Sequence, residues 1–133
     1  MFDEINFRKF GLILAVLGGG FYYAKTHIHM EQVLAYAKAR PDHVERARDI
    51  YYVGMVYWMN SDIAGATDTF NILAAEETTT YYTPKALMRL GSCYRDMNRF
   101  AESKAVYERY LEEYPKGEDT QIVQTNYEFV KMR

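Results

Sequence analysis

The feature that most constrains this chain is an internal repeat with a period of 37 residues. Glycine and aromatic residues recur at this interval along the middle of the sequence. The equivalent pairs are Gly54 and Gly91, Tyr57 and Tyr94, and Phe70 and Tyr107. Because periods of about 20–50 residues are typical of repeat architectures, the chain is expected to fold as two copies of one supersecondary unit.

Each copy of the repeat is expected to be a pair of helices joined by a short polar break. The breaks lie at residues 60–62 in the first copy and at residues 96–98 in the second. Only three prolines and eight glycines occur in 133 residues, which favours helices, and 49% of the residues are apolar. That content is typical of a chain with a packed core rather than of a disordered one.

Capping residues mark where the helices begin and end. Asp42, followed three residues later by Glu45, resembles a capping box and predicts a helix that begins next to it. Thr83 before Pro84 indicates an N-cap and a first helical residue. Pro115 predicts the end of the fourth helix of the repeat region.

The two copies resemble the tetratricopeptide repeat, a helical hairpin of about 34 residues with conserved small and aromatic positions. The second copy matches that pattern with Leu90, Gly91, Tyr94, Phe100, Tyr107 and Pro115. The first copy matches it with Val53, Gly54, Tyr57, Ala66 and Phe70. The resemblance implies an all-α solenoid of stacked antiparallel hairpins, in which the first helix of each hairpin lines a concave binding surface.

The expected organisation follows from this register. It has an N-terminal anchor helix at 1–30, a connecting helix at 31–46 and a tetratricopeptide-like domain at 47–133. The domain holds repeats at about 47–77 and 84–115 and a capping helix at 119–132. Since about three repeats are needed for independent stability, this domain is expected to depend on the neighbouring helices and on a partner.

The N-terminal segment is expected to be an uncleaved transmembrane anchor. Fifteen residues from Phe10 to Ala24 carry no charge. As a helix they span about 22 Å, short of a hydrocarbon core of roughly 30 Å, although flanking cationic and tyrosine side chains extend the reach. Tyr22 stands where a signal-peptide cut after Ala24 would need a small residue. A buried core helix is the alternative.

Small residues in this segment suggest a packing face within the membrane. Gly11, Ala15 and Gly19 recur every four residues, so they lie on one side of a helix. This spacing lets helix backbones approach closely in lipid. The three consecutive glycines at 18–20 are equally consistent with a kinked or flexible point.

The charges that flank the uncharged segment only weakly favour one orientation of the predicted anchor in the membrane. Arg8 and Lys9 precede the uncharged segment, and Lys25 follows it. The near charges favour an orientation with the C-terminal domain outside the cytoplasm. The chain is expected to be a single-pass protein of a bacterial inner membrane. A wider window that includes Lys38 and Arg40 reverses the count.

Composition and motifs exclude several function classes. The net charge of −2 argues against a nucleic-acid partner. The single cysteine, Cys93, excludes an internal disulfide and is expected to be a small buried apolar residue. His27 and His29 point to different sides of a helix, which makes them poor joint metal ligands. We therefore expect no enzyme, no catalytic, cofactor or metal site, and no small-molecule substrate.

Protein binding by the first helix of each repeat is the expected activity. On the register of the tetratricopeptide repeat, the residues on the concave side are Arg48, Tyr51, Met55 and Trp58, then Lys85, Met88, Ser92 and Arg95. Tryptophan and arginine are enriched in binding hot spots, and methionine adapts to varied surfaces. Alternatively, Met55 and Trp58 pack against the preceding helix.

The chain is thus expected to be a non-enzymatic scaffold that helps to assemble or stabilise a multi-subunit membrane complex. Its partners would be other protein subunits, together with lipid around the N-terminal helix. The alternative is a freestanding, membrane-tethered adaptor that captures peptides of exported proteins in a chaperone-like manner.

Overall fold

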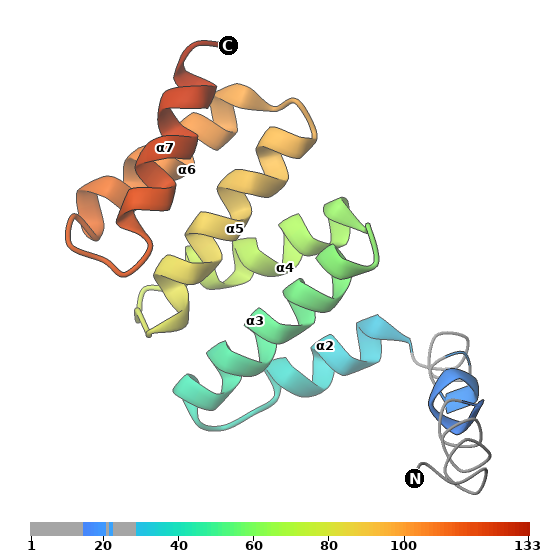
Figure 1. The fold of residues 1–133 in the computed structure, drawn as a ribbon. Coiled ribbons are helices and arrows are strands. Elements are labelled where there is room, and N and C mark those ends of the chain that lie inside the picture. The colour runs from blue at the N-terminus through green and yellow to red at the C-terminus, as the bar shows by residue number, and fades with distance from the viewer. Residues whose placement is uncertain (1–14, 21, 23–28) are drawn as a thin grey trace, which may run out of the picture. The chain divides into compact units, whose positions relative to one another are not determined.

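A computed structural model describes residues 15–20, 22 and 29–133 (Figure 1). The chain divides into two compact units, Met1–Val33 and Leu34–Arg133. In the first unit, residues 15–20 and Tyr22 are helical. Most of the predicted anchor, Gly11 included, lies outside the described residues, and none of the helices formed by the described residues combines the length and apolar character needed to cross a membrane.

The second unit is a stack of antiparallel helices. The helices described from residue 29 onward are α2 (Met30–Lys38), α3 (His43–Met59), α4 (Ile63–Ala75), α5 (Tyr82–Asp96), α6 (Phe100–Glu113) and α7 (Thr120–Lys131). From α3 to α7, successive helices pack on one another, and α3, α5 and α7 lie side by side in front of α4 and α6 (Figure 1). This arrangement confirms the expected all-α architecture of stacked hairpins.

The helix starts follow the local chemistry of their caps, with one correction. The Asp42 side chain accepts a hydrogen bond from the Glu45 backbone N–H at 2.8 Å, so α3 begins where predicted. The prediction that Thr83 is an N-cap is wrong, because α5 begins at Tyr82, two residues before the predicted first helical residue, Pro84. Thr80 instead accepts from the Tyr82 N–H at 3.1 Å, while its own N–H donates to the Thr83 hydroxyl at 2.9 Å. The two threonines therefore form a reciprocal capping box.

The two hairpins repeat one another down to the backbone of their turns. Ser61 has φ of 63° and Asn98 has φ of 58°, and these two residues are 37 positions apart. Both adopt the left-handed region that non-glycine residues rarely occupy. The period found in the sequence therefore sets the turn conformation as well as the side-chain pattern.

An aromatic ring packed against a glycine joins the two helices of each hairpin. A Cβ atom added at Gly54 would lie 2.5 Å from Cε1 of Phe70, and one added at Gly91 would overlap the Tyr107 ring. Phe70 and Tyr107 are both fully buried. The equivalent glycines therefore allow α3 to approach α4, and α5 to approach α6, more closely than any residue with a side chain would.

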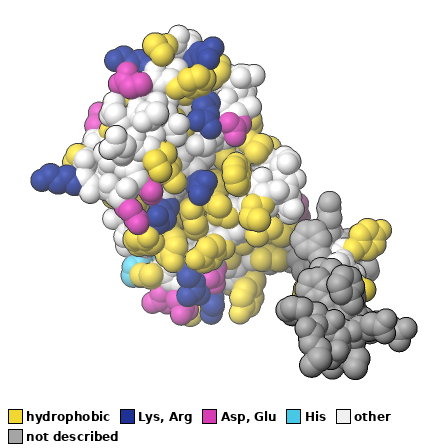
Figure 2. All heavy atoms as spheres, viewed as in Figure 1, with side chains coloured by type: hydrophobic (Ala, Val, Ile, Leu, Met, Phe, Trp, Pro, Cys, Tyr) yellow, Lys and Arg dark blue, Asp and Glu magenta, His cyan; other side chains and the backbone are white. Residues whose placement is uncertain are grey.

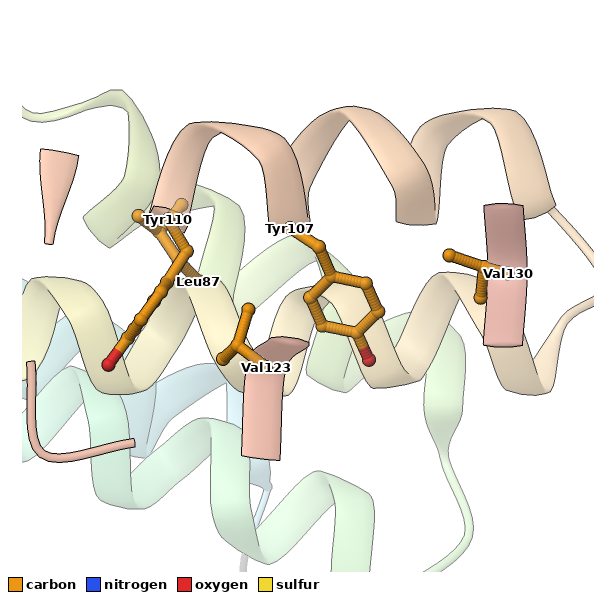
Figure 3. Packing of buried hydrophobic residues seen from close by; sticks show 5 residues of the cluster. All are labelled: Leu87, Tyr107, Tyr110, Val123 and Val130. Carbon is orange, nitrogen blue, oxygen red and sulfur yellow. The ribbon is translucent and has the colours of Figure 1, made fainter. Parts of the chain in front are cut away.

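The second hairpin continues into a core shared by three helices. Tyr107 and Tyr110 of α6 lie beside Leu87 of α5 and beside Val123 and Val130 of α7 (Figure 3). The hydroxyls of Tyr107 and Ser92 share a hydrogen bond of 3.1 Å, so the buried ring keeps its polar atom satisfied.

The last helix closes the stack because its outer face is polar. Leu87 and Gly91 of α5 pack against Tyr107 of α6, and the Tyr94 hydroxyl accepts a hydrogen bond from Asn71 of α4. Shifted by 37 residues, these three positions correspond to Gln124, Glu128 and Lys131 of α7. All three α7 residues are exposed. A polar outer face is typical of a terminal repeat, which has no further hairpin to pack against.

At the other end of the stack, α3 is covered less completely by the preceding residues. Arg40, just after α2, donates to Asp49 of α3 at 2.8 Å, and Arg46 donates to the Arg40 carbonyl at 3.0 Å. Further along α3, Val56 is 40% exposed, whereas its equivalent in the second hairpin, Cys93, is fully buried. The C-terminal half of α3 therefore keeps an apolar outer face.

The contact between Gly91 and Tyr107 predicts the effect of a larger residue. Gly91→Leu should lower the free energy of unfolding by about 1–3 kcal/mol or more, because the ring has no room to move aside. Urea unfolding followed by circular dichroism measures this change. Ala101→Leu, an equal or smaller gain in bulk at an exposed position of α6, is the control and should change stability little. Equal effects of the two substitutions would contradict the assigned packing.

Candidate protein-binding face

The candidate site is a ladder of side chains across α3, α5 and α7. Its members recur every 37 residues, so each of the three helices contributes equivalent positions. The four sets of equivalent positions are Arg48, Lys85 and Ile122; Tyr51, Met88 and Thr125; Met55, Ser92 and Phe129; and Trp58, Arg95 and Met132. We call all of these residues the ladder. Side-chain contacts between neighbouring helices join residues that are 31 positions apart, as in Trp58 with Arg89 and Arg95 with Asn126.

On α3, three of the four predicted residues reach the surface. Trp58 is 37% exposed, and Met55 and Arg48 are half-buried. Tyr51 is only 8% exposed, with its ring 5.8 Å from that of Phe70 and 5.6 Å from that of Tyr82. The structure thus places Tyr51 in the core between the two hairpins, and its ring is not available to a partner.

On α5, the predicted residue Lys85 is occupied by contacts within the chain. Its ammonium group lies 3.2 Å from Glu118 and 3.4 Å from Asp119, and 5.1 Å above the Tyr81 ring. Burial lowers the pKa of Lys85, but the hydrogen bonds and negative charges of these neighbours outweigh it and raise that pKa above its ordinary value. Lys85 therefore ties α5 to the start of α7.

The other α5 residues of the ladder are partly available. Met88 is half-buried and packs against the core of α5, α6 and α7. Arg95 donates to the side-chain oxygen of Asn126 on α7 at 3.2 Å and lies 3.4 Å from Asp96. These bonds hold the Arg95 guanidinium in place between two helices while leaving about a third of its side chain exposed.

The sequence analysis did not predict that residues of α7 belong to the binding face. Ile122, Phe129 and Met132 are 55%, 42% and 80% exposed, and the Arg133 guanidinium lies 4.5 Å above the Phe129 ring. They could have been found by extending the 37-residue period from α5 to the residues of α7. Because α7 has a polar outer face and buries Val123 and Val130, these exposed apolar side chains stand out from what a capping helix needs.

Apolar and positively charged side chains occur together on this face of the molecule. Figure 2 shows hydrophobic side chains over much of it, with Lys and Arg side chains set among them. The guanidinium of Arg89 on α5 lies 5.5 Å above the Trp58 ring of α3. This cation–π contact holds the Trp58 side chain from the side of α5, rather than leaving it free to rotate.

The described residues offer little for covalent or metal chemistry. They contain no cluster of three or more His, Cys, Asp or Glu residues that could hold a metal ion. Cys93 is fully buried, and burial raises the pKa of its thiol from 9.0 to about 11. His29 and His43 are exposed, and His27 lies outside the described residues.

Comparison with known proteins identifies the second hairpin. Residues 85–117 match the model of the tetratricopeptide repeat family. The chain therefore carries a tetratricopeptide-like repeat. No curated protein and no solved structure matches the chain. The matched residues run from Lys85 in α5 through α6 to Gly117, and the α3–α4 hairpin repeats their geometry 37 residues earlier.

Tetratricopeptide repeats serve as modules for protein–protein interaction, and their stacked first helices form extended binding surfaces. That role agrees with a ladder built from first helices. The match supports protein partners in general, and it gives no indication of their identity.

The environment of Cys93 predicts an unreactive thiol in the folded protein. At pH 8 a pKa of about 11 instead of 9.0 lowers the thiolate fraction about a hundredfold, and the sulfur is shielded from reagents as well. Iodoacetamide should therefore label the native protein far more slowly than the same protein in urea, as followed by intact mass. Equal labelling rates in the two conditions would contradict the burial of this residue.

Proposed function

We propose that the chain is a non-enzymatic interaction module that holds a segment of another protein against the ladder of α3, α5 and α7. The observation that carries this proposal is the exposure of apolar ladder side chains on two of its helices, Trp58 on α3 and Ile122, Phe129 and Met132 on α7. Exposed apolar side chains that gather on a folded domain are typical of binding surfaces. Cations among them suit the composition of interface hot spots.

The contacts beneath the ladder support a preorganised surface. Arg89 stacks on Trp58, Arg95 bonds to Asn126, and Lys85 is fixed by Glu118 and Asp119. Side chains held in one conformation before binding lose less entropy when a partner arrives. The ladder is thus suited to one recurrent partner conformation, which favours a permanent subunit over a module that captures varied peptides.

We further propose that this module works at a membrane, as a scaffold within a multi-subunit assembly. The uncharged run from Phe10 to Ala24 supports tethering through the N-terminal segment, with Gly11, Ala15 and Gly19 as its packing face. Its near flanking charges favour the C-terminal unit outside the cytoplasm. The alternative, a freestanding adaptor for peptides of exported proteins, would use the same ladder without a permanent partner.

The tether predicts how the protein fractionates. Alkaline carbonate washing of membranes should leave the chain in the pellet, because a helix in lipid does not depend on ionic contacts. Intact mass should retain residues 1–24. Recovery of the protein in the wash, or of a mature form that starts near Lys25, would refute the tether while leaving the ladder untouched.

The ladder predicts the effect of truncating its tryptophan. Trp58→Ala should weaken association with the native partner by about 2 kcal/mol, roughly thirtyfold in affinity, if this side chain is a hot spot. Quantitative co-purification in mild detergent measures the loss, and a permanent subunit should be recovered with its partner in fixed proportion. Circular dichroism should show retained helicity, because Trp58 lies partly in solvent.

Val44→Ala provides the matched control. Val44 is an apolar residue that is 45% exposed on the same helix, but it does not belong to the ladder. It should leave the amount of co-purified partner unchanged. Full retention of partner by Trp58→Ala would move the binding surface away from the ladder.

A further inference from the structure

The outer edge of α3 carries a stripe of apolar side chains that do not belong to the ladder. Tyr52, Val56 and Met59 follow one another at intervals of four and three residues, so they share one side of this helix. They are 55%, 40% and 72% exposed. We call these three residues the edge stripe.

The edge stripe is more apolar than the same side of a helix inside the stack. The equivalent positions of α5, 37 residues later, are Arg89, Cys93 and Asp96. A terminal helix whose outer face stays in water is expected to be polar there, as α7 is. On α3, apolar residues stand instead where α5 has Arg89 and Asp96. The edge stripe is therefore suited to packing against another surface.

Charges of opposite sign lie at the two ends of the edge stripe. Arg48 lies one turn before Tyr52, and Asp62 comes directly after α3, three residues beyond Met59. Between them, residues 50–61 contain no charged side chain. From its start to its end, this side of the helix is thus positive, then apolar over about two turns, then negative.

Both end charges are accessible to a partner. Arg48 donates to Asp49 at 2.9 Å, but that carboxylate also accepts from Arg40 at 2.8 Å, and 39% of the Arg48 side chain is exposed. Asp62 is exposed and uses its Oδ1 atom to accept from the Gly65 N–H at 2.9 Å. A partner that fits this edge has an acid opposite Arg48, a cation opposite Asp62 and apolar side chains between them.

A second copy of the same chain fits this description when its α3 lies antiparallel to the first. Val56 then faces its own equivalent at the centre of the contact. Tyr52 faces Met59, which is favourable because thioether sulfur and aromatic rings attract each other. Arg48 faces Asp62, and the symmetry forms this ion pair twice. A parallel pairing would instead place like charges opposite one another.

We infer that the edge stripe is the contact between two copies of this chain, paired antiparallel about a two-fold axis near Val56. The same surface of each copy is used, so the assembly closes at two. Arg48 is the one residue that belongs both to the ladder and to this contact. Each copy therefore keeps the apolar residues of its ladder for another protein.

The small size of the contact makes the pairing dependent on the proposed membrane tether. Three apolar side chains per copy, with an ion pair at either end, bury much less than the roughly 800 Å² per partner of a stable complex. Tethers that hold both copies in one membrane raise their local concentration, as a linker does for joined modules. Gly11, Ala15 and Gly19 would add a contact between the two N-terminal segments in lipid.

Cysteine cross-linking of the full-length chain in phosphatidylcholine vesicles tests this pairing. Native Cys93 is fully buried, so the unaltered chain is the blank. Val56→Cys should form a disulfide-linked dimer when a copper catalyst and air oxidise its thiol. Val44→Cys is the matched control, because Val44 is a valine of similar exposure, 45%, two turns before the edge stripe on the same helix. It should cross-link about tenfold more slowly.

A mixture of two variants tests the antiparallel direction. Tyr52→Cys and Met59→Cys, combined in mild detergent before they are placed in vesicles, should give more of the mixed dimer than random pairing would. The physical reason is that only the mixed pair brings the two thiols together. Intact mass distinguishes the mixed dimer from the two dimers of like variants. An excess of like dimers would overturn the antiparallel arrangement.

The end charges give an independent measurement. Asp62→Asn keeps a side-chain oxygen for the N-cap of α4 but removes the charge. In the Val56→Cys chain it should slow cross-linking about threefold, because two exposed ion pairs are lost. Asp68→Asn removes an exposed acid from the middle of the same helix and should leave the rate unchanged. Equal rates in the two variants would refute the ion pairs.

The remaining outcomes separate this inference from the tether on which it rests. Equal cross-linking of Val44→Cys and Val56→Cys would indicate random collision and overturn the pairing. Absence of the Val56→Cys dimer would overturn it as well, whether iodoacetamide labels the thiol, which means an open edge, or fails to, which means that a foreign subunit or the chain's own N-terminal segment covers it. Loss of the tether alone would appear as release of the unaltered chain by carbonate.

Discussion

The packing of an aromatic ring against a bare glycine backbone is the contact on which the rest of this structure depends. Phe70 against Gly54 and Tyr107 against Gly91 set the distance between the two helices of each hairpin. Because the contact recurs after 37 residues, both hairpins have the same shape, and their first helices align. Equivalent positions on α3 and α5 therefore contribute to the same binding face, the ladder. Close packing inside the stack therefore determines the surface that the stack presents.

Polar groups reinforce this packing instead of competing with it. The Ser103 hydroxyl of α6 donates to the Gly91 carbonyl of α5 at 2.7 Å. Arg109 reaches across to the Ala74 carbonyl near the end of α4 at 2.7 Å and so links the two hairpins. Each bond satisfies a backbone oxygen while fixing a helix end or a close contact. Among the described residues, Arg89 is the exception, because its Nε atom is buried without a hydrogen-bond acceptor.

Sequence reasoning captured what is local and periodic, and missed what depends on distant partners. The two hairpins, the start of α3 at Asp42 and the glycine–ring pairs follow from spacing and capping chemistry. The start of α5 was misassigned because Thr80 and Thr83 both fit the role of a cap. The burial of Tyr51 and the pairing of Lys85 could not be predicted, since they depend on Tyr82, Glu118 and Asp119, which only the fold brings near.

The two ends of the helical stack differ in polarity: the exposed face is polar on α7 and apolar on α3. Beyond α7, the residues that would meet another hairpin are Gln124, Glu128 and Lys131, so addition of a further repeat there would bury charge without partners. On α3 the corresponding edge still offers Val56 at 40% exposure, together with Tyr52 and Met59. A longer relative built on this plan would therefore gain its extra hairpins ahead of α3, with α7 kept as the fixed terminus.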